Sequence, residues 1–530
     1  MNENGWSILN DFRGKINPES CGDLLNRVML IRDYFKDKTY NEDSLYQYME
    51  KSTKDKFSKC EYNSNIFFDF YNATKGFHDK RIIELLYLIR VRQERIPYDI
   101  ANLFKQQIEH KLYKKVLITE CEKWSSILID IIKGNKDINF TLTVNTNDIS
   151  FKNLYHLIYD KYKNVKLIDI NIYEKYVLDE KYDGIISIPD FSRKISDNEK
   201  IFMTRDSNII AVQNMLLELD KEADLIVVLP ARIAFGAGMA KKLRAFIIEN
   251  FSVRELSKMP SKIFYPYVNN IETFFAVFTN KSEEIVDIKS YSFKPAILNE
   301  HKIENLSVEN KLSITKNEFN LLDTWNIDSI FLSKDEVLEK YNTSIVKKVM
   351  LKDVATVFRG KAFFKKDEVE NGNIGVINII DINENDIDYS NLSFIKNEVR
   401  KIASYKLEDK DILVTSRGTQ IKIGLFKQQE FPCIPSANIN VIRLETEEIC
   451  SEYLKLFLES PTGQMLLKKL QRGSMLVNLN FNDLKEIELP LIPKEDQIVK
   501  VNSYKLGLFH YNEAVQKWES IKRKIYQEIY

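Results

Sequence analysis

The sequence predicts an α/β protein of several domains: a helical N-terminal region, a doubly wound parallel sheet, and an α+β domain that ends in a long helix. The chain of 530 residues is longer than a single domain usually is. Between residues 111 and 280, short apolar runs of strand length alternate with helical patterns. From Val349 onward, the pattern changes to short strands with polar turns and then to helices.

Residues 1–110 are predicted to be mostly helical. The segment from Arg81 to Arg90, for example, places apolar side chains on one broad face of a helix, and these are Ile82, Ile83, Leu85, Leu86 and Leu88. Residues 281–343 are charged and only weakly periodic, so we expect a connector there. The predicted division is therefore residues 1–110, 111–280, 281–343, 344–497 and 498–530.

The central region contains the runs expected of a sheet that is buried on both faces. Asp224 to Pro230 is a continuous apolar run after its first residue, and Phe140–Val144 and Thr273–Phe278 have strand length. Another strand runs through Val116 and Ile118, and a helix is expected from Ser125 to Ile132. Together these elements predict a doubly wound α/β domain.

Charge and cysteine content limit the functional classes. The 77 basic and 77 acidic residues balance, so the composition lacks the excess of positive charge that is typical of DNA-binding proteins. A local basic patch is compatible with this balance, because phosphate contacts need only local positive charge. The five cysteines are scattered and form no Cys-x-x-Cys pair, so we predict neither a disulfide framework nor a metal site. No apolar run approaches the length of about 18 residues that spans a membrane, and the N-terminus lacks a signal pattern, so we expect a cytoplasmic protein.

Residues 182–191 resemble the catalytic loop of adenine-N6 DNA methyltransferases, in which an aspartate and a buried strand precede Asn-Pro-Pro-Phe or Asn-Pro-Pro-Tyr. The corresponding residues here are Ile188, Pro189, Asp190 and Phe191. In the family, the asparagine accepts a hydrogen bond from the amine of a flipped adenine, and the aromatic ring stacks on the base. Because isoleucine has no acceptor, the resemblance predicts a scaffold that has lost its catalytic residue, with Phe191 still able to stack. The alternative is an ordinary buried strand that ends in a turn.

The cofactor positions of the same family are altered as well. The family's first strand runs into a glycine-containing turn that admits S-adenosylmethionine, but the matching positions here are Glu120, Cys121, Glu122 and Trp124. The acidic residue expected after the next strand is replaced by Asn147, although a shifted register would place Asp148 there. We therefore expect no bound cofactor.

The segment after Pro230 resembles the modification subunit of type I restriction systems. In that family a strand ends in Leu-Pro, and a segment with glycine and a helix with arginine follow, as Gly236, Gly238 and Arg244 do here. We interpret the two glycines as a structural turn, since they come too late in the chain to form a cofactor loop.

The C-terminal third resembles the specificity subunit of type I restriction systems. Several weak motifs follow in the family's order, and they are Leu351–Gly360, Leu407–Thr419, Lys422–Gly424, Ser436–Arg443, a helix from Glu452 to Leu470, and Glu488–Gln497. In that family the domain binds DNA and reads one half of a split target. The helix after the glutamine joins this domain to another half. The helix expected from Gln497 to Ile529 would be a dimerisation helix or a domain-packing helix.

The DNA contacts implied by this resemblance follow from side-chain chemistry. Arg417, followed by Thr419 and Gln420, is our leading candidate, because a guanidinium can read guanine and a glutamine amide can read adenine. Five basic residues suit phosphate contacts, and these are Lys361, Lys365, Lys366, Lys422 and Arg472. Each lysine could equally be a solvated surface charge.

Taken together, these patterns favour a non-catalytic DNA-recognition subunit of a restriction-modification or phage-defence assembly. It would bind double-stranded DNA and act as a homodimer or with a catalytic methyltransferase or restriction subunit. One alternative is an active adenine-N6 DNA methyltransferase with a divergent catalytic loop. The other is an architectural subunit whose C-terminal domain binds protein.

Overall fold

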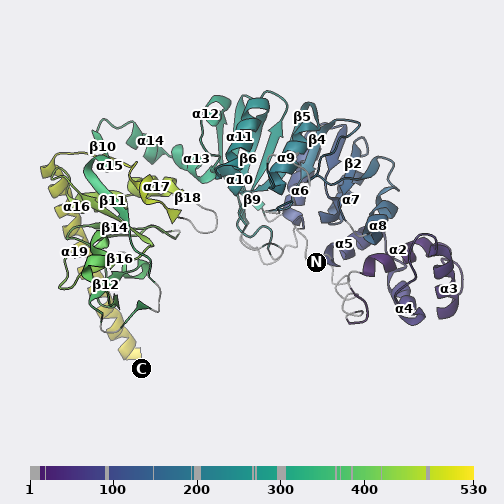
Figure 1. Ribbon diagram of the computed structural model, residues 1–530, viewed down its shortest axis with the longest axis horizontal. Coiled ribbons are helices and arrows are strands. Elements are labelled where there is room, and N and C mark those ends of the chain that lie inside the picture. Colours follow the sequence, from purple (N-terminus) through teal and green to yellow (C-terminus); the bar gives the residue numbers. More distant parts are fainter. Residues whose placement is uncertain are drawn as a thin grey trace. The chain divides into compact units, whose positions relative to one another are not determined.

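The computed structural model describes residues 12, 14–17, 20–89, 95–146, 149–191, 194–195, 204–265, 268, 271–294, 306–363, 367–369, 372–383, 386–418, 420–472 and 478–529. The chain forms two compact units, residues 1–327 and residues 328–530 (Figure 1). Each unit has its own sheets and its own buried core.

The first unit is built around a nine-stranded sheet with the order β3-β2-β1-β4-β5-β7-β6-β8-β9. The first five strands in this order are parallel to their neighbours, whereas β7 is antiparallel to both β5 and β6. The bounds are β1 Lys115–Ile118, β2 Asn139–Val144, β3 Val165–Asp169, β4 Tyr182–Ser187, β5 Leu219–Pro230, β6 Ser252–Lys258 and β7 Thr273–Thr279. This is the predicted doubly wound α/β domain, and the chain reverses its direction of winding between β1 and β4.

The point of reversal determines where a site can lie. In doubly wound sheets, ligands bind outside the carboxyl ends of the strands at the position where the strand order reverses. Here β1 ends at Ile118 and β4 ends at Ser187, and the two strands pair directly through Ile118 and Ile186. The segments that follow these two strands therefore meet at one edge of the sheet.

Helices flank the sheet and form the N-terminal region (Figure 1). Their bounds are α2 Cys21–Ile31, α3 Glu42–Thr53, α4 Ser64–Thr74, α5 Asp79–Ile89, α6 Tyr98–His110, α7 Ile127–Gly134, α8 Ile149–Tyr159, α9 Ser207–Leu217, α10 Arg232–Phe235 and α11 Met239–Asn250. The helical character predicted for residues 1–110 is present from α2 to α6. A Cβ atom added at Gly22 of α2 would lie 3.2 Å from the Phe151 ring of α8, so glycine permits the close approach of these helices.

Residues 281–343, expected to be a connector, extend the sheet by two strands. β8 (Ile285–Phe293) pairs parallel with β6, and β9 (Leu306–Thr315) pairs antiparallel with β8. Most side chains of β9 are exposed or half-buried, which explains the weak apolar pattern of this segment. Three short helices follow, α12 Lys316–Asn320, α13 Ile327–Ser333 and α14 Glu336–Asn342.

The second unit is α+β. A four-stranded antiparallel sheet has the order β11-β17-β14-β15, and a three-stranded sheet has the order β13-β12-β16. Two further pairs are β10 with β20 and β18 with β19. The bounds are β10 Lys348–Met350, β11 Ala355–Arg359, β12 Ile374–Ile377, β13 Ser393–Ile395, β14 Ile412–Thr415, β15 Ile423–Leu425, β16 Cys433–Pro435, β17 Ile439–Leu444, β18 Gln471–Arg472, β19 Asn478–Leu479 and β20 Glu488–Pro490.

The helix predicted from Glu452 to Leu470 is two helices. α16 (Ser451–Glu459) ends before Ser460, whose hydroxyl accepts a hydrogen bond from the Gly463 amide and caps α17 (Pro461–Leu470). Pro461 has no amide hydrogen and disfavours a helical residue before it, which divides the helix at this point. The final helix, α19 (Lys494–Ile529), follows the short helices α15 (Leu351–Val354) and α18 (Phe481–Leu484) in the chain.

Candidate functional site

A buried ion-pair network occupies the carboxyl ends of β1 and β4. The Lys123 ammonium donates to Glu120 Oε2 at 2.7 Å, to Asp190 Oδ1 at 2.7 Å and to the Ile188 carbonyl at 3.0 Å. Lys123 and Glu120 come from the segment after β1, whereas Ile188 and Asp190 come from the segment after β4. The side chain of Lys123 is 6% exposed and that of Glu120 is 3% exposed, so the network joins the two segments within the interior.

Glu120 is held in an unusual conformation at the centre of this network. Its backbone lies in the left-handed region (φ 52°), which is uncommon for a residue other than glycine, and its amide donates to Thr143 Oγ1 at 2.8 Å. Burial raises the pKa of the Glu120 carboxyl to about 7, against the opposing effect of the Lys123 ammonium. The neighbouring carboxylate, Glu122, accepts from the Asn145 amide at 2.9 Å.

Three residues that the sequence did not single out complete the network. The Tyr173 hydroxyl donates to Glu120 Oε2 at 3.0 Å and accepts from the Asp190 amide at 2.7 Å. Ser207 and Asn208, in the first turn of α9, donate to the Asp190 carbonyl at 3.0 Å and 2.6 Å. No local motif marks Tyr173, because its contacts come from residues far away in the sequence.

The loop that resembles the methyltransferase motif is part of the core. Ile188 and Phe191 are 2% and 8% exposed, and Pro189 is buried. The Phe191 ring lies edge-on to Phe264, with 5.0 Å between the ring centroids. This ring is therefore packed inside the unit, and stacking of Phe191 on a base stays a prediction.

The predicted cofactor positions are filled by large side chains. Cys121 and Trp124 belong to the buried core, and Trp124 packs against Phe104 of α6. Glu120, Glu122 and Lys123 are also buried. Asn147 and Asp148 lie outside the described residues. The segment after β1 therefore does not fit the glycine-containing turn through which the methyltransferase family admits S-adenosylmethionine.

Other motif residues of this unit have structural roles. Asp183 accepts from the amides of Lys114 and Lys115, both at 2.7 Å, and so joins the beginnings of β1 and β4. Gly236 and Gly238 form the expected turn between α10 and α11, and a Cβ atom at Gly236 would lie 2.4 Å from the Arg232 carbonyl oxygen. Arg244 is buried and donates to the carbonyls of Ile233 and Gly236.

The second unit contains a cleft of about 360 Å³ at one end of its four-stranded sheet. Arg359 ends β11, and Arg417 follows β14 closely. Both strands pair with β17, through Arg359 with Asn440 and Thr415 with Ile439, so the two arginines lie on either side of the start of β17. The residues that line the cleft are Arg359, Ala362, Phe363, Glu368, Val376, Asn378, Ser393, Ile395, Arg417, Ser436, Ala437 and Asn438.

The structure brings some predicted DNA contacts together at this cleft. Arg417 lines it, and Lys361 lies at its edge, bridged through its backbone to Ser436. The Lys422 ammonium instead donates to the Ile382 carbonyl at 2.8 Å. Gln420 is exposed.

The remaining predicted contacts are not described. Thr419, Lys365 and Lys366 lie outside the described residues, as does the side chain of Arg472, whose backbone pairs with Asn478 in β18 and β19. Sequence reasoning missed Arg359, since the motif around it identified a strand and gave no sign that the strand ends beside Arg417.

The C-terminal helix α19 is attached at its beginning by Gln497. This side chain is fully buried, accepts from the Cys450 amide at 2.9 Å, and donates to the carbonyls of Glu448 and Ile492 at 2.8 Å and 2.9 Å. Beyond Val501, α19 has apolar residues at alternating steps of three and four residues, except that the step after Trp518 falls on Lys522. The large exposed members of this repeat are Tyr504, Tyr511, Val515, Trp518, Ile525 and Ile529.

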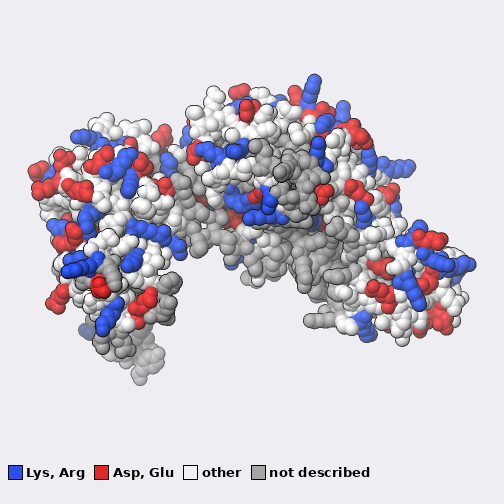
Figure 2. Space-filling view, in the orientation of Figure 1, with Lys and Arg blue, Asp and Glu red and all other residues white. Residues whose placement is uncertain are grey.

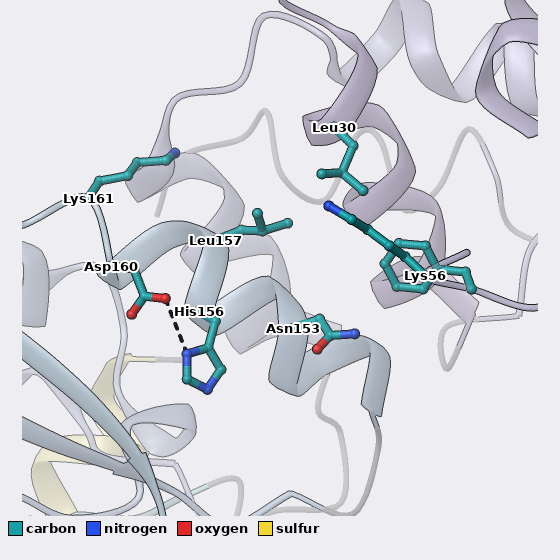
Figure 3. Close-up of a pocket in the computed structure, with 8 residues that line it drawn as sticks. Leu30, Lys56, Asn153, His156, Leu157, Asp160 and Lys161 are labelled. Atoms are coloured by element: carbon teal, nitrogen blue, oxygen red, sulfur yellow. Dashed lines mark hydrogen bonds and ion pairs between the residues drawn. The ribbon is translucent and has the colours of Figure 1, made fainter. Parts of the chain in front are cut away.

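A separate cavity of about 590 Å³ lies in the first unit between α8 and the segment that contains Leu30, Lys56 and Phe57 (Figure 3). His156 Nδ1 lies 3.3 Å from Asp160 Oδ2 within it. Lys161, also in the lining, donates to Asp79 at 2.8 Å. The polar side chains of the lining thus include residues that already pair with Asp160 and Asp79.

The described residues contain neither a cluster of metal ligands nor a membrane-spanning helix. In this part of the chain, His, Cys, Asp and Glu side chains form no group of three or more that is arranged to hold a metal ion. Among the same residues, no helix has the length and apolar character needed to cross a membrane. Acidic and basic side chains are interspersed over the face shown in Figure 2.

Comparison with known proteins identifies the second unit. Residues 344–502 match the type I restriction modification DNA specificity domain. Over 160 residues the chain is 28% identical to the type I restriction enzyme EcoBI specificity subunit of Escherichia coli. This match covers 28% of the present chain and 31% of that subunit, so the chain spans about a third of the length of its curated relative.

Solved structures of similar fold include two restriction-modification proteins. The type IIG restriction endonuclease BpuSI is 12% identical, and the match covers 94% of this chain and 74% of that chain with a TM-score of 0.48. A type I restriction-modification methyltransferase subunit from Streptococcus thermophilus is 10% identical, with 54% and 86% covered and a TM-score of 0.40.

The comparisons thus assign the second unit, whereas the first unit is described by its doubly wound α/β sheet. The second unit contains a type I specificity domain, as the motifs from Leu351 to Gln497 predicted.

Proposed function

We propose that this protein is a non-catalytic DNA-recognition subunit of a restriction-modification assembly. The observation that carries this proposal is the pairing of a specificity domain over residues 344–502 with a methyltransferase-like unit whose crevice is filled by its own side chains. The first would bind double-stranded DNA, and the second would supply a rigid scaffold. An assembly of this kind would serve in defence against phage.

The absence of catalysis follows from two features of the first unit. Ile188 stands at the position of the family's asparagine and has no acceptor for an adenine amine. Lys123 bridges Glu120 and Asp190 at the edge of the sheet where doubly wound folds bind their ligands. Entry of a cofactor at this edge would require breaking a buried ion-pair network.

The kind of partner is inferred from the exposed apolar residues of α19. Beyond Gln497 and Val501, which are its buried residues, this helix exposes Val515 (39%), Trp518 (58%) and Ile525 (47%). Apolar residues at alternating spacings of three and four favour packing against a second helix. A single specificity domain would read half of a split target, so a second copy or a related subunit would contribute the other half and the matching helix. The catalytic methyltransferase or restriction activity would come from a further subunit.

Cofactor binding and methyl transfer test the proposal directly. Isothermal titration of the full chain with S-adenosylmethionine at high micromolar concentration is expected to give no heat of binding. Incubation with tritiated S-adenosylmethionine and mixed duplex DNA is expected to give no label above a heat-denatured control. A functional adenine-N6 methyltransferase run in parallel shows that both assays work. Measurable binding together with methylated adenine would establish the active-enzyme alternative instead.

DNA binding is the second requirement. The full chain should bind a 30-base-pair duplex of random sequence in a fluorescence anisotropy assay, with an affinity that falls as salt rises, because phosphate neutralisation releases counterions. A chain that binds no duplex at low salt, alone or with its copurified partner, would refute the recognition role and favour the architectural alternative.

A further inference from the structure

We propose that the cleft between Arg359 and Arg417 binds a backbone phosphate of the DNA, so that Arg417 positions the duplex and does not read a base. This inference rests on the proposed DNA-binding function and assigns the chemical group that the cleft receives. It also assigns Arg359 and Ser436 to the same site.

The donors of the cleft suit a tetrahedral anion. Arg359 and Arg417 both contribute guanidinium groups, and no hydrogen bond or ion pair involves the Arg417 guanidinium within the described part of the chain. Ser436 is 8% exposed, and its hydroxyl has no hydrogen-bond partner among the described residues. A buried hydroxyl without a partner is energetically unfavourable. The Ser436 hydroxyl is closed to solvent, so a phosphate oxygen would accept its hydrogen bond only after the lining of the cleft moves.

Hydrogen bonds within the second unit fix the Arg359 guanidinium and the backbone beside Arg417. Arg359 Nε donates to the Ala437 carbonyl at 2.6 Å, which fixes this guanidinium and leaves its terminal nitrogens as donors. The backbone beside Arg417 is fixed on both sides, because the Ser416 amide donates to Asn438 O at 2.8 Å and its carbonyl accepts from the Leu479 amide at 2.7 Å. Two forked cations beside one cleft match the geometry of phosphate oxygens, and one of them, Arg359, is already oriented.

The shape of the site favours a phosphate over a base edge. Reading a base requires a side chain that reaches into the major groove, which is about 8.5 Å deep. Arg417 lines a concave cleft of about 360 Å³, whereas the phosphates protrude from the surface of a duplex and can enter such a cleft. Glu368 is the one carboxylate in the lining, and it is exposed to solvent, so the two arginines determine the sign of the local charge.

The salt dependence of DNA binding tests this assignment. Each lost phosphate contact should reduce the slope of log K against log salt by about 0.9. We expect Arg417→Ala and Arg359→Ala each to reduce the slope of the full chain by less than this amount, because the other arginine still contacts the phosphate. The double variant should reduce the slope by about 0.9 in total, because both arginines contact one phosphate. Each variant should bind about tenfold more weakly to every sequence.

Control variants show whether an effect comes from the cleft arginines, from charge alone or from a loss of folding. Lys427→Ala removes an exposed cation after β15, at the opposite end of the four-stranded sheet, and should leave the slope unchanged. Arg417→Lys keeps the charge and should keep most of the slope. Circular dichroism and thermal unfolding of each variant confirm that it is folded.

The outcomes are distinct. Affinity should be measured on random duplex and on a target enriched from a random library by the wild-type chain. If Arg417→Ala weakens only the enriched target and leaves the slope intact, Arg417 reads a base and the phosphate assignment is wrong. Unchanged binding by both single variants overturns it as well, while wild-type binding keeps the recognition function. If the wild-type chain binds no DNA, the proposed function itself fails.

Discussion

Replacing Lys123 with methionine should destabilise the first unit, and the loss should grow with pH. The substitution preserves an apolar stem of similar length and removes the ammonium that links Glu120 to Asp190. Glu120 would then be a buried carboxyl without its cation, whereas Asp190, 23% exposed, would retain contact with water. Removing one partner of a buried ion pair typically costs about 3–5 kcal/mol.

The pH dependence follows from the pKa of Glu120. Burial raises this pKa from 4.5 to about 7, so the folded state holds a proton that the unfolded state releases earlier. The stability from this group is complete below pH 4.5 and is lost as the pH rises through about 7. Without the ammonium of Lys123 the pKa rises further, since the ammonium opposes the effect of burial. The difference between wild type and variant should therefore be small near pH 5 and grow as the pH rises above about 7, by up to about 1.4 kcal/mol per pH unit.

Hydrogen exchange gives the local free energy of opening that this prediction needs. Unfolding of a chain with two compact units need not be two-state, whereas exchange of peptides that cover residues 115–124 and 182–191 reports on this part of the sheet alone. Exchange rates should be corrected for their intrinsic pH dependence. Lys115→Met, which removes an exposed lysine from the first residue of β1, should leave the exchange of these peptides unchanged.

A second variant tests the assignment to Glu120. Lys123→Met combined with Glu120→Gln removes both the cation and the acid, so most of the pH dependence should disappear. If Lys123→Met alone changes the opening free energy by less than about 1 kcal/mol at pH 8, the value expected of an exposed pair, Lys123 is not a buried bridge. The reasoning about the filled crevice would then be wrong.

Three further predictions concern other parts of the chain. Asp224→Asn should destabilise the first unit by about 3–5 kcal/mol, because this fully buried carboxylate accepts from Tyr113 and Arg254, both at 2.7 Å. Burial raises its pKa, but Arg254, Lys111 and Tyr113 hold the pKa below the ordinary value, so the wild-type advantage should shrink in acid below about pH 4 in urea titrations. Val515→Glu with Trp518→Glu should convert the associated form to a monomer in sedimentation, whereas Gln516→Glu should not; a wild-type monomer at tens of micromolar that copurifies with no partner would make α19 only a packing helix. Gly360→Ala should distort the cleft and weaken DNA binding, since its Cβ atom would lie 2.2 Å from the Ser436 carbonyl oxygen; wild-type affinity in this variant would contradict the described geometry.

The strands that carry the first unit were predictable because they are buried on both faces. The apolar runs predicted for Phe140–Val144, Asp224–Pro230 and Thr273–Phe278 appear within β2, β5 and β7. The strands β8 and β9 were not predicted, because they lie toward an edge of the sheet, where half-buried and exposed side chains weaken the apolar pattern.

The candidate sites were predictable only in part, since they depend on contacts between distant segments. The sequence showed that glycines and an asparagine are missing from the methyltransferase pattern, but Lys123 and Asp190 are 67 residues apart, and nothing local to either predicts that they pair. In the same way, Arg417 was singled out from its turn, whereas Arg359 became a candidate only when the pairing of β11 and β14 with β17 placed the two arginines beside one cleft.

The filled crevice also bears on whether a cofactor could reclaim it. A ligand that displaced Lys123 from Glu120 and Asp190 would first have to separate a buried ion pair, a step that costs about 3 kcal/mol or more. Because each 1.4 kcal/mol changes an affinity about tenfold, this cost alone lowers the affinity of any such ligand by about two orders of magnitude. Restoring an asparagine at Ile188 would therefore not restore catalysis, since the ion pair would still occupy the crevice. Under the proposed function, an internal network therefore stands where a ligand would bind, and recognition belongs to the second unit.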